Sequence, residues 1–253
     1  MSGRPKQRAD VLLCERGLAP SRARAQSFIL AGEVFTGEQR VEKPGTLLAA
    51  DVELRVAPRR RFVSRGGDKL DAALAAFGGR FTDLAGVVAV DIGASTGGFT
   101  DCLLQRGVAK VYAVDVGYGQ LDAKLRADPR VVSRERTNAR ELAATDFDEP
   151  IDLVVVDASF IGLSKLLGPI AGVLGGRGGE LVALVKPQFE VGREEASRGK
   201  GVVRDDAVRE AAIAAVRGSL ADAGFSIVAE ADSAVLGPKG NRERFLYARA
   251  RRG

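Results

Sequence analysis

The chain has 253 residues, 45% of them hydrophobic, with two cysteines and no histidine, which excludes Ser-His-Asp and Cys-His catalysis and most zinc chemistry. No apolar run approaches the roughly 20 residues of a membrane helix and the N-terminus lacks the apolar core of a signal peptide, so we expect a cytoplasmic protein that does not enter a membrane. The net charge of +5 is uneven, because residues 1–65 contain 13 Lys or Arg against 7 Asp or Glu, and this favours a polyanion-binding module joined to a nearly neutral one.

The first 57 residues predict a small α+β unit. Apolar residues at helical spacing indicate a helix from Val11 to Leu18, and a second helix is expected from Pro20 to Gly32. Short strands are expected at 33–37 and 51–56, around a turn-rich middle.

This stretch resembles the S4 RNA-binding module through the pattern R-A-D-V-L-L-x-E-R-G-L-A-x-S-R-A-x-A, which begins at Arg8. The resemblance implies an RNA-binding domain over residues 1–57, in which Arg8, Arg22 and Arg24 hold the basic positions and Lys6 and Lys43 flank them. For any single arginine, an ordinary solvated charge is an equally good interpretation.

A basic linker is predicted at residues 58–64. Its arginines, Arg59, Arg60 and Arg61, either contact phosphate or keep a hinge solvated, and Arg65 continues the basic stretch as a further RNA contact.

The second domain is predicted over 65–253 and begins with a helix. Leu70, Ala73, Leu74 and Phe77 share one face of it. Lys69 falls in the first turn, where the helix dipole disfavours a cation, so its position needs a reason other than helix stability.

Residues 87–101 read as strand, turn and helix, which is where an α/β sheet binds a ligand. The glycine spacing differs from the G-x-G-x-x-G of dinucleotide sites, and an acid ends the strand two residues before the first glycine. This pattern suits a ligand with a cationic group, such as S-adenosylmethionine (SAM). The predicted cofactor contacts are Asp91, Gly93, Ala94, Ser95, Thr96, Gly97, Gly98 and Phe99.

Two later residues extend this predicted cofactor site. Asp115 ends the next apolar strand, about 20 residues after the turn, as a ribose-binding acid requires. Asn138 lies in the turn after a third strand, where it either reads the adenine edge or only caps a loop.

The remaining elements predict a doubly wound, mostly parallel sheet. Buried strands are expected at 151–157 and 179–186, and an antiparallel hairpin at 225–231 and 243–248. The fold class is therefore α/β, a Rossmann-like sheet of the SAM-dependent methyltransferase type with a small N-terminal α+β domain.

Four charged residues are expected at one edge of this sheet: Lys69, Asp157, Lys186 and Glu243. Buried charges are costly unless they compensate one another, so two acids and two lysines together indicate a built site. No set of metal ligands is expected.

This tetrad resembles the Lys-Asp-Lys-Glu set of FtsJ/RrmJ-like ribose 2'-O-methyltransferases. The whole chain is similar to the TlyA family, historically labelled haemolysins, through S-R-G-G-x-K-L, D-I-G-A-S-T-G-G-F-T-D, D-V-G-Y-G-Q-L, R-T-N-A-R, V-K-P-Q-F-E and G-N-x-E. The resemblance implies methylation of cytidine 2'-hydroxyls in ribosomal RNA. The chain ends at Gly253, without the extra C-terminal helix of longer members, so the large subunit is the expected partner of a monomeric enzyme.

The chemistry expected is attack of a ribose oxygen on a sulfonium methyl group. Lys186 either takes the hydroxyl proton or stays charged and orients the oxygen, while Lys69 and Glu243 hold the ribose and the lysines in place. Two alternatives are a non-catalytic S4-type RNA-binding ribosome factor, which has no use for the tetrad, and a cytolysin, which needs a membrane-inserting stretch.

Overall fold

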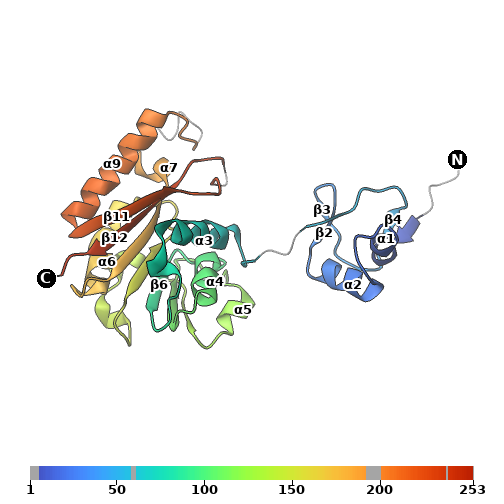
Figure 1. The fold of residues 1–253 in the computed structure, drawn as a ribbon, viewed down its shortest axis with the longest axis horizontal. Helices are drawn as coiled ribbons and strands as arrows, with labels where there is room; N and C mark the ends of the chain where they lie inside the picture. Colours follow the sequence, from blue (N-terminus) through green and yellow to red (C-terminus); the bar gives the residue numbers. More distant parts are fainter. Residues whose placement is uncertain (1–5, 58–60, 192–200, 238, 253) are drawn as a thin grey trace. The chain divides into compact units, whose positions relative to one another are not determined.

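The computed structural model describes residues 6–57, 61–191, 201–237 and 239–252, and it divides into two compact units, Met1–Arg60 and Arg61–Gly253 (Figure 1). Each unit has its own hydrophobic core. No helix within these ranges is long and apolar enough to cross a membrane.

The first unit packs two helices against short strands. Its apolar core includes Leu12, Leu13 and Ile29 from the helices and Val34 from the first strand after them. The expected strand at 51–56 is shorter than predicted, and a strand before the first helix was missed, because three-residue strands carry almost no periodic signal. The elements are β1 (Lys6–Arg8), α1 (Ala9–Glu15), α2 (Arg22–Leu30), β2 (Val34–Thr36), β3 (Gln39–Arg40), β4 (Leu47–Ala49) and β5 (Arg55–Val56), with β1 paired to β4 and β2 to both β3 and β5.

The second unit is built on a seven-stranded sheet of order β11-β12-β10-β9-β6-β7-β8, in which β12 runs antiparallel to both of its neighbours. This is the predicted α/β architecture with its C-terminal hairpin. The strands are β6 (Val88–Ile92), β7 (Lys110–Val114), β8 (Val131–Arg134), β9 (Leu153–Val156), β10 (Glu180–Val185), β11 (Phe225–Asp232) and β12 (Arg244–Ala250).

The helices between these strands begin with α3, whose first residue is Arg65. They are α3 (Arg65–Phe77), α4 (Gly98–Gln105), α5 (Ala123–Arg126), α6 (Leu167–Leu174), α7 (Pro187–Glu190) and α9 (Asp206–Asp222), with 3₁₀ turns η1 (Gly79–Phe81), η2 (Ala139–Glu141), η3 (Ala144–Asp146) and η4 (Leu163–Lys165).

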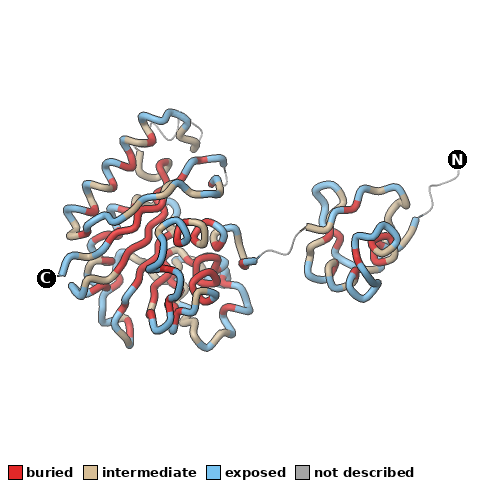
Figure 2. The backbone as a smooth tube through the Cα atoms, viewed as in Figure 1, coloured by how far each residue is buried: buried red, intermediate tan, exposed pale blue. Residues whose placement is uncertain are grey.

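The sheet is covered on both faces, which is why its central strands are apolar throughout instead of alternating. Successive residues of β9, such as Val154 and Val155, belong to different core clusters. The cluster with Val155 contains residues of α3 and α4, and the cluster with Val154 contains residues of α6 and α9. Figure 2 shows the buried strands between exposed helix surfaces.

Residues 61–64, predicted to be part of the linker, belong to the second unit. Phe62 is buried in its core, and the backbone N–H of Val63 donates to Asp101 Oδ2 at 2.9 Å. Ser64 caps α3 by accepting from the N–H of Gly66. Of the predicted linker, residues 58–60 lie outside the described ranges.

Candidate functional site

The four charged residues of the predicted tetrad form two ion pairs at one edge of the sheet. Lys186 follows the last residue of β10, and Asp157 follows β9. Glu243 precedes β12, and Lys69 lies in α3. Because β12 is antiparallel, its amino end meets the carboxyl ends of β9 and β10 at this edge, which we call the carboxyl edge.

The first pair is Lys186 and Asp157. The Lys186 Nζ lies 2.7 Å from Asp157 Oδ1, at an angle that departs from that of a hydrogen bond. It donates to Ser159 Oγ at 2.8 Å and more weakly to the backbone oxygen of Asp157 at 3.3 Å. The buried Lys186 Nζ therefore has three oxygen atoms close to it, and it donates hydrogen bonds to two of them.

The second pair is Lys69 and Glu243, both buried. The Lys69 Nζ donates to Glu243 Oε2 at 2.5 Å, with 9% of the lysine side chain exposed and none of the glutamate. The other glutamate oxygen, Oε1, has no hydrogen-bond partner in the part of the chain that the structure describes. This pairing supplies the reason for placing a cation in the first turn of α3.

Strand register brings the two pairs together. Val185 and Arg244 are the last paired residues of β10 and β12, so Lys186 and Glu243 occupy the next position on each strand. Ala183 of β10 is paired with Val156 of β9, which places Asp157 on the adjoining strand end. The sheet therefore gathers Asp157, Lys186 and Glu243 from segments far apart in the chain, and the ion pair with Glu243 brings Lys69 of α3 to the same edge.

Asn241, two residues before Glu243, anchors this corner and was not among the predicted site residues. Its side chain is buried, accepts from the backbone N–H of Val203 at 2.9 Å and donates to the backbone oxygen of Gly201 at 2.8 Å. The G-N-x-E pattern was the available sequence signal, but nothing in it identifies these partners.

A cavity of about 420 Å³ opens beside the Lys186–Asp157 pair. Gly93, Ser95, Asp115 and Asn138 of the predicted cofactor residues line it, together with Asp157. Asp91 and five others do not, and these five are Ala94, Thr96, Gly97, Gly98 and Phe99. These five support the turn and helix instead, as when Gly97 packs so closely on Leu125 that a Cβ would collide with it.

Gly93 and Asp115 shape the cavity wall. A Cβ at Gly93, whose φ is +81°, would lie 2.9 Å from the backbone oxygen of Asp157, so only glycine fits there. The Asp115 carboxylate accepts from the backbone N–H groups of Ser95 at 2.8 Å and Gly117 at 2.7 Å. It is thereby fixed in position with lone pairs still free.

Asp91 lies behind this wall and does not line the cavity. Its side chain is fully buried and accepts from the backbone N–H and the hydroxyl of Thr100, at 2.9 and 2.7 Å. Burial raises the pKa of Asp91 to about 7, although these hydrogen bonds oppose the rise. Its Oδ1 has no partner among the residues described.

Asn138 caps η2, which is one of the two interpretations that the sequence left open. Its side-chain oxygen accepts from the N–H of Arg140, and its amide donates to Glu141 at 2.8 Å. The cap does not remove it from the cavity wall, so contact with a ligand is still possible geometrically.

Ser159 and Phe160 also line the cavity and were not predicted as site residues. Phe160 is 92% exposed and adopts φ +65°, a strained conformation for a bulky residue. Its ring lies 5.4 Å from that of Phe189. The sequence signal was an aromatic residue three positions after the acid that ends a strand, which periodicity cannot distinguish from a core residue.

The predicted RNA-binding residues of the first unit are exposed, but two of them also have structural partners. Arg8 and Arg22 both bind the buried carboxylate of Asp10 with Nε–O distances of 3.0 Å. The Arg8 hydrogen bond, more than any other contact, lowers the pKa of Asp10. About half of each arginine side chain stays accessible.

The other basic residues predicted to bind RNA are less constrained. Lys6 and Lys43 are exposed, and Arg24 stacks over the ring of Phe28 at 4.8 Å. In the second unit Arg65 is exposed, whereas Arg61 pairs with Asp71. Arg59 and Arg60 lie outside the described residues.

Comparison with known proteins agrees with both units. The profile of the FtsJ-like methyltransferase family matches residues 62–251, and that of the S4 domain matches residues 7–54. The chain is 45% identical over 246 residues to the 16S/23S rRNA (cytidine-2'-O)-methyltransferase TlyA of Mycobacterium tuberculosis, covering 96% of this chain and 90% of that protein.

Two further similarities carry a haemolysin label. Hemolysin A of Brachyspira hyodysenteriae is 40% identical over 242 residues, covering 95% of this chain and 98% of that protein. A solved structure of a Streptococcus thermophilus protein described as a hemolysin superposes with a TM-score of 0.73 at 41% identity, covering 98% of this chain and 90% of that one.

Proposed function

The chain belongs to the TlyA family, which joins an S4 domain to an FtsJ-like methyltransferase, and from this premise we propose that it transfers a methyl group from SAM to the 2'-hydroxyl of cytidine in ribosomal RNA. The observation that supports this function most directly is that two ion pairs, Lys69–Glu243 and Lys186–Asp157, lie at the edge of the sheet where a cavity suited to the cofactor opens. We propose 23S rRNA as the first substrate, since it is the RNA that the names of the M. tuberculosis relative and of a Campylobacter jejuni relative, 35% identical over 158 residues, have in common. Such a substrate lies in the cytoplasm.

The cavity fits SAM in its chemistry. Asp115 presents a fixed carboxylate able to accept from ribose hydroxyls, and Gly93 leaves the backbone open to close approach. The unpartnered Oδ1 of Asp91 behind the turn is a further acceptor for an ordered water or donor. When bound, SAM supplies an electrophilic methyl group on a sulfonium.

Lys186 is proposed to orient the attacking ribose oxygen. Its ammonium already faces three acceptors, of which the backbone oxygen of Asp157 at 3.3 Å is the weakest and the one that a substrate oxygen can replace. A charged Lys186 draws the hydroxyl oxygen into line, and proximity then contributes most of the rate. Asp157, 2.7 Å from this Nζ, is proposed to hold it in position.

Lys69 and Glu243 are proposed to hold the substrate ribose beside Lys186. Glu243 Oε1 is free of hydrogen bonds among the described residues and lies 2.6 Å from where a Cβ of Gly237 would be, so a side chain at Gly237 would cover it. Because this oxygen is buried, Glu243 is proposed to act by fixing the Lys69 ammonium. Phe160, exposed at the cavity mouth, offers a ring on which an unstacked base can lie.

The first unit is proposed to bind RNA through its exposed basic residues, which are Lys6, Arg8, Arg22, Arg24 and Lys43. In the second unit, Arg61 and Arg65 are proposed to contact the same RNA. Because Arg8 and Arg22 are also held by Asp10, their guanidinium groups are ordered before RNA arrives, which reduces the entropy lost on binding.

The test is nucleoside mass spectrometry after incubating the protein and SAM with unmodified 50S subunits, 30S subunits and free 23S rRNA. We expect 2'-O-methylcytidine in the 50S sample and none with Lys186→Met. A folded protein that binds these RNAs but modifies no ribose would instead support the RNA-binding factor. Methylation of 30S subunits alone would contradict the choice of 23S rRNA.

A further inference from the structure

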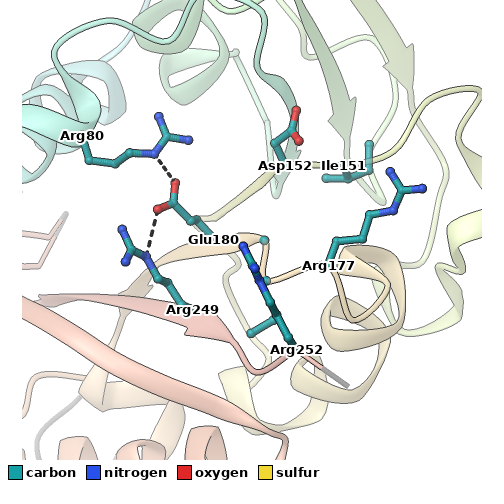
Figure 3. Close-up of a pocket in the computed structure, with 10 residues that line it drawn as sticks. Arg80, Ile151, Asp152, Arg177, Glu180, Arg249 and Arg252 are labelled. Carbon is teal, nitrogen blue, oxygen red and sulfur yellow. Dashed lines mark hydrogen bonds and ion pairs between the residues drawn. The ribbon is translucent and has the colours of Figure 1, made fainter.

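A second pocket of about 420 Å³ lies at the opposite edge of the sheet from Lys186 (Figure 3). Asp152 precedes β9, Glu180 is the first residue of β10, and Arg249 is near the end of antiparallel β12. All three positions therefore lie at the amino-terminal edge of the parallel strands. We call this the arginine pocket.

Four arginines from three segments line the arginine pocket. Arg80 and Arg249 flank the buried Glu180, with Nε–O distances of 2.8 and 3.2 Å, and Figure 3 shows both pairs converging on its carboxylate. Arg177 and Arg252 are exposed, and neither has an ion-pair partner among the described residues. Glu180 thus neutralises only part of the charge.

The pocket also contains a second carboxylate, that of Asp152. Asp152 Oδ2 accepts from the backbone N–H of Val88 at 3.0 Å, while its Oδ1 has no hydrogen-bond partner within the described ranges. The lining therefore combines surplus guanidinium donors with one carboxylate oxygen, Asp152 Oδ1, that no described residue binds. Guanidinium groups match phosphate oxygens in bidentate geometry, and a carboxylate oxygen accepts from a hydroxyl.

We propose that the arginine pocket binds a ribose-phosphate unit of the RNA substrate, at a point remote from the methylated nucleotide. Arg177 and Arg252 bind the phosphate, and Asp152 accepts from the adjacent 2'-hydroxyl. A free phosphate makes no use of Asp152, and DNA lacks the hydroxyl, so RNA matches the lining best. The inference rests on the proposed function, because it adds a second contact to the same substrate.

This position predicts that only folded RNA uses the pocket. The strands separate the arginine pocket from the carboxyl edge, so a short oligonucleotide held at Lys186 does not reach Arg177. A large folded RNA can contact both edges. The contact therefore contributes to the recognition of folded RNA without affecting the chemical step.

The test compares Arg177→Gln/Arg252→Gln with Arg251→Gln, an exposed neighbour outside the pocket whose Nε donates to Ser226. Binding of unmodified 23S rRNA and of a cytidine dinucleotide, which is too short to span the roughly 20 Å of the six-residue β10, is measured from 50 to 200 mM salt. Because both arginines bind the same phosphate, their loss reduces the slope of log K against log salt by about 0.9, so that the difference in affinity between the double variant and the wild type narrows about 3.5-fold over this range. Dinucleotide binding and SAM binding stay unchanged.

Three outcomes decide the proposal. A smaller salt slope for 23S rRNA in the double variant alone supports it. An unchanged slope overturns it, and so does loss of inorganic phosphate binding with unchanged RNA affinity, because that assigns the pocket to a free anion. Wild-type methylation of 23S rRNA, measured in parallel, tests the proposed function separately, so its absence is not mistaken for failure of the pocket.

Discussion

Replacing Lys69 by methionine tests whether each charge of the buried Lys69–Glu243 pair needs the other for the fold to be stable. The change leaves the Glu243 carboxylate buried, with Oε2 deprived of its 2.5 Å partner and Oε1 already without one among the described residues. At an effective dielectric constant of about 20, the lost attraction is roughly 6–7 kcal/mol. Since desolvation of the lysine offsets part of it, we expect Lys69→Met to lower the free energy of unfolding by about 3–5 kcal/mol.

Urea denaturation of the second unit measures this loss in a double-mutant cycle with Glu243→Gln. Removing both charges should recover most of the loss and give a coupling energy above about 2 kcal/mol. The control is Lys110→Met, which breaks the more exposed pair with Glu149 and should cost about 0–1 kcal/mol. The reasoning is refuted if Lys69→Met costs no more than Lys110→Met, or if the two changes are additive.

Three further predictions concern the cofactor and the reaction. Lys186→Arg keeps the cation and should retain measurable methyl transfer, whereas Lys186→Met should reduce it by at least about 100-fold with SAM affinity unchanged; equal inactivity of the two would favour a base role. Asp115→Ala should weaken SAM binding by about 10–100-fold in calorimetry, and Asp152→Ala, at the opposite edge, should not. Burial raises the pKa of Asp91 to about 7, which is above its value in the unfolded chain. The contribution of Asp91 to the free energy of unfolding is therefore most favourable below pH 4, and it falls by roughly 4 kcal/mol as the pH rises to 7. Asp91→Asn should therefore flatten the dependence of unfolding free energy on pH between 4 and 7, and parallel curves for variant and wild type would contradict this.

The sheet could be predicted because its central strands are unusually uniform. Within the predicted strands, residues 153–156 and 181–185 are apolar at every position, and the structure buries every residue of β9 and β10. Asp157 and Lys186, which follow these two strands, then fall at the carboxyl edge because the strands are parallel. Placing Glu243 at the same edge required in addition that the last hairpin be antiparallel.

The pairing within the tetrad could not be predicted. Lys69 and Glu243 are 174 positions apart, and the sequence gives no register between α3 and β12. The same limit applies to the arginine pocket, whose side chains come from four segments that share no motif. For Asn138 the sequence allowed both a cap and a ligand contact, because a short polar residue in a turn serves either purpose.

The hydrogen bonds of Asn241 have a mechanical consequence. One amide fastens residues 201–203, which lead toward α9, to the chain just before β12. Pulling that stretch away costs both bonds and loosens the backbone from which Glu243 extends. The position of Glu243, which binds Lys69, therefore depends on the hydrogen bonds between Asn241 and a stretch some forty positions earlier in the chain. A substitution confined to residues 201–203 should weaken the Lys69–Glu243 pair without contacting the lysine.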